Sequence, residues 1–198
     1  YEMQRSLVGS EMCIRDSMVV VTKCPDQIEP VNMRMISKQL GGDITSRNLN
    51  PRPYQGLYFS KVVYGGLLPV FPDDKPYNVN LSLLTERDTV LLLTGIANPR
   101  GFVRYFKNYP FKVVVSHYPD HHDFTRKDIE SLMKKFSSLS GERKLIITTE
   151  KDAIRLAYNP YIPTKTKPLM FYLPIGVRML DKPDGTDFME ELKRRIEE

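Results

Sequence analysis

Apolar and polar positions alternate in blocks along most of this chain. Short runs of β-branched and large aliphatic residues are typical of strands that are buried on both faces. These runs predict strands at 18–23, 88–95, 111–118 and 143–149, with one or two more in each of 55–71 and 168–180. Apolar residues at helical spacing predict helices at 25–40, 98–109, 125–139, 150–157 and 185–198. Strands that alternate with helices predict an α/β fold with a mostly parallel sheet and helices on both faces.

A change of composition divides the chain. Residues 72–87 are rich in Pro, Asp and Asn and predict an exposed connection. Regular alternation of strands and helices begins only after it. We therefore expect a first segment at 18–55, a β-strand linker at 56–87 and a C-terminal α/β domain at 88–198.

The overall composition of the chain excludes few classes of function. The 198 residues are 41% hydrophobic and 27% charged, as in ordinary globular proteins. A net charge of +5 is compatible with nucleic acid, phosphates or an anionic membrane surface and selects none of them. The Lys and Arg residues are scattered along helix faces rather than clustered with aromatics, so we expect no nucleic-acid partner. The two cysteines cannot form a disulfide framework, and no apolar run is long enough to span a bilayer.

The beginning of the chain does not resemble natural protein. Residues 6–17, SLVGSEMCIRDS, have no sustained helical or strand period. They resemble the conceptual translation of a transposon adapter that is used to prepare DNA sequencing libraries. We therefore treat residues 1–17 as a non-native scar and exclude them from fold reasoning.

Three predicted loops each follow a strand and open a helix. Ligands of parallel sheets gather at the carboxyl ends of the strands, so these loops are candidate sites. In the first, TGIANPRGF, Gly95 permits unusual backbone angles, Asn98 suits the N-cap and Pro99 suits the first helical position. Free N–H groups at a helix start favour an anion, although simple turn and cap chemistry explains the same residues.

The second loop contains two adjacent histidines beside an acid. Asp120, His121 and His122 precede a helix for which Thr125 is the expected N-cap and Asp128 its capping-box partner. An imidazole beside a carboxylate suits proton transfer, and a hydrated polar loop that caps the helix is an equally good interpretation. A metal site is weaker, because neighbouring residues seldom aim both side chains at one ion.

The third loop, TTEKDAIRL, pairs Thr149 with Asp152 at capping-box spacing. Glu150 and Asp152 suit the positive end of the helix dipole, and Lys151 lies where an anion could bind. A well-capped helix accounts for most of this motif without a ligand.

A fourth feature lies near the start, in VVVTKCPD. Thr22 and Lys23 after a strand are similar to the base-reading loop of P-loop nucleotidases. That loop has the form Lys-x-Asp, whereas Asp26 comes one position too late, so the match is weak.

The motifs TKCP, TGIANP, DHH followed by DFT, and TEKDAIRL occur in this order along the chain. The ordered set resembles the tetraacyldisaccharide 4′-kinase family, the lipid A 4′-kinases of Gram-negative bacteria, from about Val19 to the C-terminus. A helix-capping account alone does not predict the order.

The resemblance implies a phosphotransferase that moves the γ-phosphoryl group of ATP, with Mg²⁺, to the 4′-hydroxyl of a tetraacyldisaccharide 1-phosphate. It implies two α/β domains joined by a β linker, with residues 18–55 a remnant of the N-terminal P-loop domain. His121, supported by Asp120, would orient the catalytic Asp of that domain. It also implies a lipid substrate and a peripheral position at the cytoplasmic face of the inner membrane. The residues expected near substrate or nucleotide are Thr22, Lys23, Gly95, Asn98, His122, Thr149, Glu150, Lys151 and Asp152.

The chain departs from the family pattern in one respect, because a G-x-x-x-x-G-K-[ST] P-loop is absent. We therefore expect an inactive kinase fragment, with ATP and Mg²⁺ bound mainly by the missing N-terminal domain and no metal site in the fragment. Two alternatives stay open: a metal-dependent phosphoesterase that uses Asp120, His121 and His122, and a non-catalytic binding module. For the phosphoesterase, the upstream acid pair Asp73-Asp74 lies in the linker, in the wrong context.

Overall fold

The computed structural model describes residues 18–40, 56–182, 185 and 187–197. The adapter-like segment and the end of the expected 18–55 remnant lie outside the described residues. The chain divides into two compact units, one of residues 1–63 with 177–198 and one of residues 64–176. Each unit is considered by itself below.

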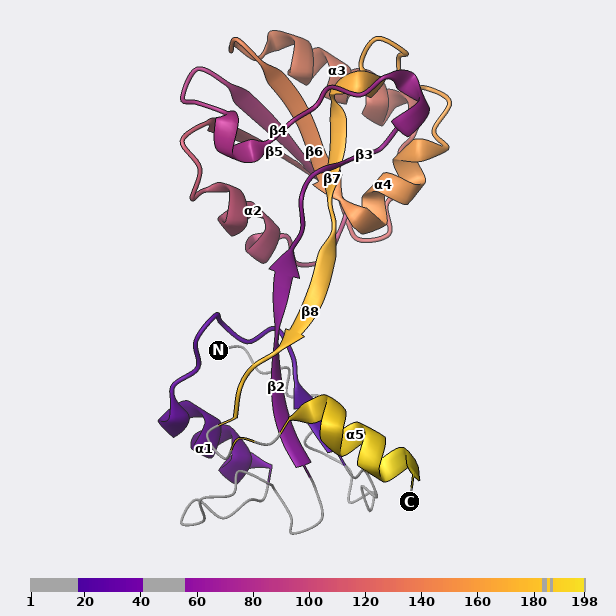
Figure 1. Cartoon of the computed structure of the whole chain (residues 1–198). Coiled ribbons are helices and arrows are strands. Elements are labelled where there is room, and N and C mark those ends of the chain that lie inside the picture. The colour runs from indigo at the N-terminus through magenta and orange to yellow at the C-terminus, as the bar shows by residue number, and fades with distance from the viewer. Residues whose placement is uncertain (1–17, 41–55, 183–184, 186, 198) are drawn as a thin grey trace. The chain divides into compact units, whose positions relative to one another are not determined.

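The second unit contains a five-stranded sheet in the order β3-β7-β6-β4-β5 (Figure 1). Three parallel pairings join β5 to β4, β4 to β6 and β6 to β7, and β3 pairs antiparallel with β7. The strands are β3 (Leu68–Pro69), β4 (Thr89–Thr94), β5 (Lys112–His117), β6 (Lys144–Thr149) and β7 (Met170–Leu173). The α-helices are α2 (Arg100–Phe106), α3 (Arg126–Ser138) and α4 (Glu150–Ala157), with short 3-10 turns at Pro72–Asp74, Leu81–Leu83 and Lys167–Leu169.

Both faces of this sheet are covered, which explains the unbroken apolar run of β4. Leu91 and Leu93 pack in a cluster that includes residues of α3 and α4, such as Leu132 and Leu156. Val90 and Leu92 point to the other face, into a cluster with α2. Side chains alternate across a strand, so a strand with a helix layer on each side needs apolar residues at every position.

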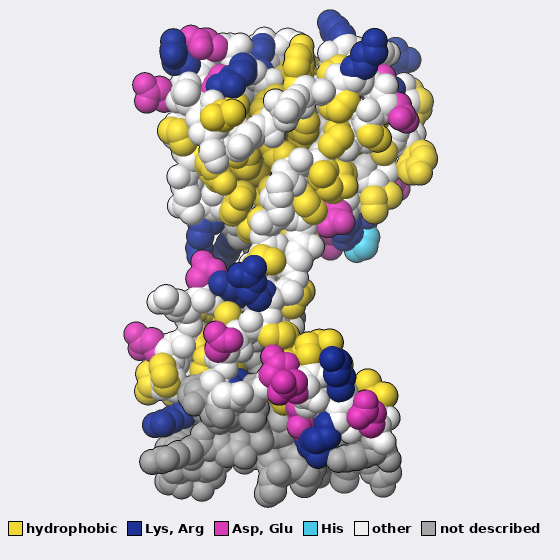
Figure 2. All heavy atoms as spheres, viewed as in Figure 1, with side chains coloured by type: hydrophobic (Ala, Val, Ile, Leu, Met, Phe, Trp, Pro, Cys, Tyr) yellow, Lys and Arg dark blue, Asp and Glu magenta, His cyan; other side chains and the backbone are white. Residues whose placement is uncertain are grey.

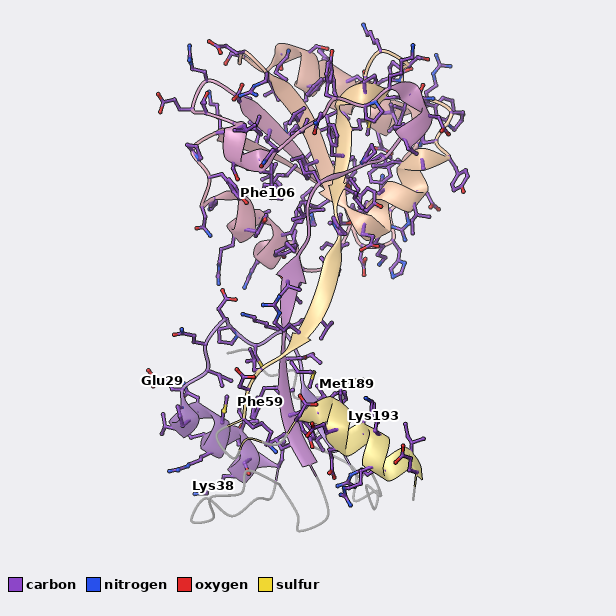
Figure 3. The ribbon with its side chains drawn as sticks, in the orientation of Figure 1. Glu29, Lys38, Phe59, Phe106, Met189 and Lys193 are labelled. Atoms are coloured by element: carbon purple, nitrogen blue, oxygen red, sulfur yellow. The ribbon has the colours of Figure 1, made fainter. Side chains whose placement is uncertain are left out.

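Each helix of the second unit presents one apolar face to the sheet. On α3 the buried residues are Ile129, Leu132 and Phe136, at helical spacing. On α2 they are Phe102 and Phe106, and Phe106 is fully buried (Figure 3). This arrangement confirms the predicted α/β class with parallel strands and helices on both faces.

The first unit is built on a three-stranded sheet in the order β1-β2-β8. Its elements are β1 (Met18–Val21), α1 (Pro30–Gln39), β2 (Gly56–Tyr64), β8 (Ile175–Met179) and α5 (Phe188–Glu197). Leu57 and Phe59 of β2 are completely buried against α1 residues Met33 and Ile36 (Figure 3). Between these two residues on β2, the Tyr58 ring packs edge to face against the Phe188 ring of α5, with the ring centroids 5.1 Å apart.

The compact units divide the chain at other places than the sequence boundaries suggested. Of the expected 56–87 linker, residues 64–87 belong to the second unit, where Leu81 and Leu84 are buried against the sheet. Residues 177–198, which we assigned to the C-terminal domain, belong to the first unit because Leu180 and α5 pack on β2. Pro and Asn in residues 72–87 indicated a loop but gave no sign that Leu81 and Leu84 within it are buried.

An ion pair between a buried carboxylate and a half-exposed guanidinium stabilises the start of β4, where the Arg143 side chain is 53% exposed. Asp88 is 1% exposed, and its carboxylate accepts hydrogen bonds from the Arg143 guanidinium at 2.7 and 3.0 Å and from the Thr85 backbone N–H at 2.7 Å. The Arg143 hydrogen bond is the main cause that lowers the pKa of Asp88 to about 2. The pair joins the start of β4 to the start of β6.

We expect this pair to make folding sensitive to acid. The folded-state pKa of Asp88 lies below its ordinary value of 3.8, so its stabilising contribution is complete above about pH 4 and is lost as the pH falls towards 2. The shift corresponds to at most about 2 kcal/mol of unfolding free energy. Denaturant unfolding at a series of pH values would measure it. In Asp88→Asn the difference in unfolding free energy from the unsubstituted protein should shrink as the pH falls through this range, and a constant difference would contradict the assignment.

Candidate active site

The three candidate loops meet at one edge of the sheet, as the parallel strand order requires. Thr94 at the end of β4 pairs with His117 at the end of β5, and Leu93 pairs with Thr148 of β6. The chain after β4 and β5, and the start of α4 directly after β6, therefore lie together. The Asp152 carboxylate and the Lys151 ammonium contact the other two loops from α4.

Asp120 and His121 form the exposed part of this edge. Lys151 Nζ lies 3.0 Å from Asp120 Oδ1 and 3.3 Å from His121 Nε2, and Arg155 Nη2 lies 3.2 Å from His121 Nδ1. The His121 side chain is 72% exposed, and His121 Nε2 is 3.7 Å from Asp120 Oδ2. Figure 2 shows a histidine side chain beside basic and acidic side chains at the rim of the second unit. The imidazole is held by α4 on one side and is open to solvent on the other.

The local backbone holds this ring in an unusual place. His121 has φ = 58°, in the left-handed region that non-glycine residues seldom adopt. Its backbone N–H donates to Asp120 Oδ1 at 3.0 Å, which closes a tight local turn. The Lys151 ammonium, and to a lesser degree His121, holds the pKa of Asp120 below its usual range, so this residue is a carboxylate at neutral pH. Strained backbone of this kind is often found at functional sites.

His122 points elsewhere and has a structural role. Its Nε2 lies 3.0 Å from Asp128 Oδ2, and its ring stacks on Tyr118 with centroids 4.9 Å apart. Thr125 and Asp128 form the predicted capping box, and the hydrogen bonds from Thr125 are the main cause that lowers the pKa of Asp128. The two histidines thus have different surroundings: His122 supports the helix cap, and the catalytic role of His121 stays a prediction.

Asp152 is a buried carboxylate that joins two of the loops. It is fully buried, and its Oδ2 accepts hydrogen bonds from the Gly95 backbone N–H at 2.8 Å and from Thr149 Oγ1 at 2.7 Å. The predicted cap of α4 by Thr149 is present, because its side chain accepts from the Asp152 backbone N–H. The Asp152 side chain, however, reaches to Gly95 and not back to the Thr149 N–H.

Gly95 was predicted to permit an unusual backbone angle, and this prediction was wrong. Among the described glycines only Gly141 and Gly185 have a positive φ, so Gly95 is not needed for an unusual backbone angle. A Cβ at Gly95 would lie 3.0 Å from Asp152 Oδ1 and 3.6 Å from the Phe124 ring. Glycine suits this position because the buried Asp152 carboxylate lies closer than a Cβ normally tolerates.

Gly95→Ala should therefore destabilise the fold, by about 1–3 kcal/mol, because the new methyl group must displace a buried side chain. Thermal or denaturant unfolding measures this effect. Gly66→Ala is the matched control, since a Cβ there meets nothing within 4 Å. Equal stabilities of the two variants would show that the contact with Asp152 imposes no constraint.

Asn98 and Glu150 also differ from expectation. The N-cap of α2 is Pro99 and the helix begins at Arg100, whereas Asn98 Oδ1 accepts from the Arg100 N–H at 3.2 Å in a turn before the helix. Asn98 therefore lies one residue before the assigned N-cap, and its side chain still accepts a hydrogen bond from the first helical N–H. Glu150 Oε2 accepts from the Ile175 backbone N–H at 3.2 Å and so holds the chain that leaves β7.

Thr22 and Lys23 belong to the first unit, and their proximity to substrate or nucleotide stays a prediction. Lys23 has φ = 58°, the left-handed value. The nearby Cys24 thiol is a buried free cysteine that donates to the Val21 carbonyl, and burial raises its pKa. This loop contains no pair of the Lys-x-Asp form; Asp26 is bonded instead to Lys61 at 3.0 Å.

A family comparison covers the part of the chain that holds the three loops. A family model described as "LpxK: Tetraacyldisaccharide-1-P 4'-kinase" matches residues 71–197, well over half of the chain. The chain belongs to the tetraacyldisaccharide-1-P 4′-kinase family. The matched residues of this family include all three loops at the sheet edge, and with them Asp120, His121 and α4.

Curated relatives carry the same name. A tetraacyldisaccharide 4′-kinase of Bacteroides thetaiotaomicron is 41% identical over 172 residues, covering 84% of this chain and 43% of that protein. One of Phocaeicola vulgatus is 38% identical over 166 residues, covering 84% of this chain and 42% of that protein. The chain thus spans less than half the length of these curated relatives of the kinase family.

Among solved structures, the "apo" form of LpxK from Aquifex aeolicus in complex with ATP is similar at a TM-score of 0.40. The identity is 21%, and the match covers 74% of this chain and 38% of that one. We rest no conclusion about the kinase site on so distant a likeness.

Sequence reasoning missed one residue of the site. Arg155 contacts both His121 and Asp152, yet in the sequence it is an ordinary basic residue in the last turn of α4, where it suits the helix dipole. One signal was present, because Lys151 and Arg155 are four residues apart and so share a helix face. Nothing in the sequence showed that this face meets the histidine loop.

Proposed function

We propose that this chain is the C-terminal part of a tetraacyldisaccharide 4′-kinase. The complete enzyme would transfer the γ-phosphoryl group of ATP to the 4′-hydroxyl of a tetraacyldisaccharide 1-phosphate. The observation that supports this most is the position of His121: it lies on the family's matched residues, at the carboxyl edge of a parallel sheet, beside a carboxylate and with a largely exposed ring. Such a ring can meet a group that another part of the enzyme supplies.

Catalysis of phosphoryl transfer depends mainly on positioning the reacting groups and on stabilising the charge of the transition state. In this proposal the His121 imidazole hydrogen-bonds the carboxylate that accepts the proton of the sugar hydroxyl, and that carboxylate belongs to the N-terminal domain. Asp120 and Lys151 hold the loop, because Asp120 bonds the His121 N–H while Lys151 pairs with Asp120 at 3.0 Å. The chain thus contributes an orienting ring.

The described residues show no clustered metal site for the Mg²⁺ ion that the family activity implies. Throughout residues 18–40 and 56–182 and the described part of α5, no three His, Cys, Asp or Glu side chains form a group that could hold a metal. His121 and His122 contact different partners, as shown above. We propose that the N-terminal domain holds the metal together with most of the ATP, and we derive no step through Mg²⁺ here.

The lipid substrate and the site of action also belong to the proposal. A tetraacylated disaccharide lies in a membrane, so the complete enzyme would work at the cytoplasmic face of the inner membrane as a peripheral protein. None of the helices in the described ranges is long and apolar enough to cross a membrane.

A phosphotransfer assay tests the proposal. We would join the N-terminal part of the Bacteroides thetaiotaomicron relative to residues 18–198, and supply ATP labelled at the γ-phosphate, Mg²⁺ and tetraacyldisaccharide 1-phosphate. The chimera should label the lipid, and the 198-residue chain alone should not exceed background because it has no P-loop. A folded chimera without labelled lipid would refute the assigned activity, and labelling by the chain alone would refute the dependence on a second domain.

A further inference from the structure

The contacts of the His121 ring are unusual because two cations approach its two nitrogens. Arg155 Nη2 lies 3.2 Å from Nδ1, and Lys151 Nζ lies 3.3 Å from Nε2. Neither cation has a lone pair, so each can only donate a hydrogen bond. A neutral imidazole offers one bare nitrogen, and therefore only one of the two contacts can be a hydrogen bond at a time.

The surroundings of the two cations differ. Lys151 already bonds the Asp120 carboxylate at 3.0 Å, and its side chain is 42% exposed on a flexible stem. Arg155 is 24% exposed, and its planar head is anchored from behind, with Nη1 3.6 Å from Oδ1 of the fully buried Asp152. Apart from this ion pair, neither Nη1 nor Oδ1 has a hydrogen-bond partner among the residues described.

Asp152 itself cannot move easily. Its other oxygen, Oδ2, is fixed by the Gly95 N–H and by the Thr149 hydroxyl, one from each of two neighbouring strand ends. A buried carboxylate needs a compensating charge, so Asp152 holds the guanidinium of Arg155 at this place. The fixed guanidinium then presents its second nitrogen to the imidazole.

We infer that Arg155, held by Asp152, is a positioning residue that fixes His121 with Nδ1 as the acceptor and Nε2–H as the outward donor. Asp120 Oδ2, at 3.7 Å, is too far to take a full hydrogen bond from Nε2–H. This N–H is therefore left for a carboxylate from the N-terminal domain. The hydrogen-bond geometry of the His121 ring does not depend on the proposed function, whereas the use of this geometry in catalysis rests on it.

Nuclear magnetic resonance of the 198-residue chain tests the geometry without any activity. Long-range ¹H–¹⁵N spectra at about pH 8.5, where an ordinary histidine is neutral, show which ring nitrogen carries the proton. We expect His121 to carry it on Nε2, and Arg155→Met to shift the Nδ1 resonance towards that of an imidazole without this donor. A proton on Nδ1, or an Nδ1 resonance unchanged in Arg155→Met, would overturn the inference.

Three further variants separate positioning from general damage. Arg155→Lys keeps a cation over Asp152 but loses the two-nitrogen fork, so it should shift Nδ1 while the protein stays folded. The exposed Arg104→Met on α2 should leave the Nδ1 resonance in place, and Lys151→Met, which only loosens the Asp120 loop, should shift it less than Arg155→Met does. If the Nδ1 resonance shifted as much in Lys151→Met as in Arg155→Met, Arg155 would not be the specific donor to Nδ1, and the inference would be overturned.

Kinetics of the chimera connect the contact to the reaction. Arg155→Lys should lower kcat about tenfold, the scale of a modest misplacement of a reacting group. In a His121→Ala background the same change should have no effect, because Arg155 acts only through the ring. An equal loss in both backgrounds would show that Arg155 acts in another way. If His121→Ala by itself does not lower kcat, the proposed catalytic role of the ring is wrong. The spectroscopic result would still test whether Arg155 fixes the protonated nitrogen of the ring.

Discussion

His121→Ala in the chimeric kinase is expected to lower kcat by about 100-fold, the lower range for a group that assists proton transfer. The ring is removed from the exposed edge of the second unit, where, among the described residues, it contacts its own loop and α4. Its loss should affect turnover more than KM for ATP, because the nucleotide is bound mainly by the other domain in this account. Steady-state rates at saturating ATP and lipid measure the change.

His122→Ala is the matched control, since it removes the same ring from the neighbouring position. It should leave kcat unchanged and lower the unfolding free energy by about 1–2 kcal/mol, because the hydrogen bond to Asp128 and the stack on Tyr118 are lost. Equal kinetic losses in the two variants would show that the loop as a whole matters and that His121 has no special role.

Asp88→Ala is expected to destabilise the protein by about 1–3 kcal/mol, the cost of leaving the buried donors around this carboxylate without a partner, since the Arg143 side chain is 53% exposed and can still be hydrated. The substitution leaves the Thr85 and Arg143 backbone N–H groups without their acceptor, and it leaves the Arg143 guanidinium with only the Leu83 carbonyl. Asp88 lies at the opposite end of β4 from the candidate site. The effect should therefore appear in denaturant unfolding, while the site of a chimera that still folds should be unchanged.

Asp74→Ala is the control for this prediction. Its partner Lys167 lies at a similar distance, 3.2 Å, but the Asp74 side chain is 28% exposed, whereas that of Asp88 is 1% exposed. Partly exposed pairs contribute at most about 1 kcal/mol, so this variant should unfold close to the unsubstituted protein. A loss as large as that of Asp88→Ala would mean that burial does not determine the strength of these pairs.

The elements that the sequence predicted correctly depend on local rules. The expected strand at 88–95 is β4, because a continuous apolar run suits a strand covered on both faces. The helix at 125–139 is α3, since Thr125 and Asp128 satisfy the first backbone N–H groups within the same turn. The parallel order then placed the loops after these strands at one edge without further information.

Contacts between residues that are far apart in sequence could not be predicted in this way. Asp152 bonds the Gly95 N–H across 57 positions, and Arg155 reaches His121 across 34. Local patterns predicted Asp152 as a capping residue and Gly95 as a residue that permits unusual backbone angles. Both interpretations missed that one buried carboxylate joins the two loops and, through Arg155, supports the imidazole.

The most direct test of the account is the single-turnover rate of phosphoryl transfer to tetraacyldisaccharide 1-phosphate at saturating ATP. The rate would be compared between the N-terminal part of the Bacteroides thetaiotaomicron relative alone, the chimera with residues 18–198, and the chimera with His121→Ala. The account predicts fast transfer by the intact chimera only, with the His121→Ala chimera about 100-fold slower. Equal rates with and without residues 18–198, in folded proteins, would contradict it.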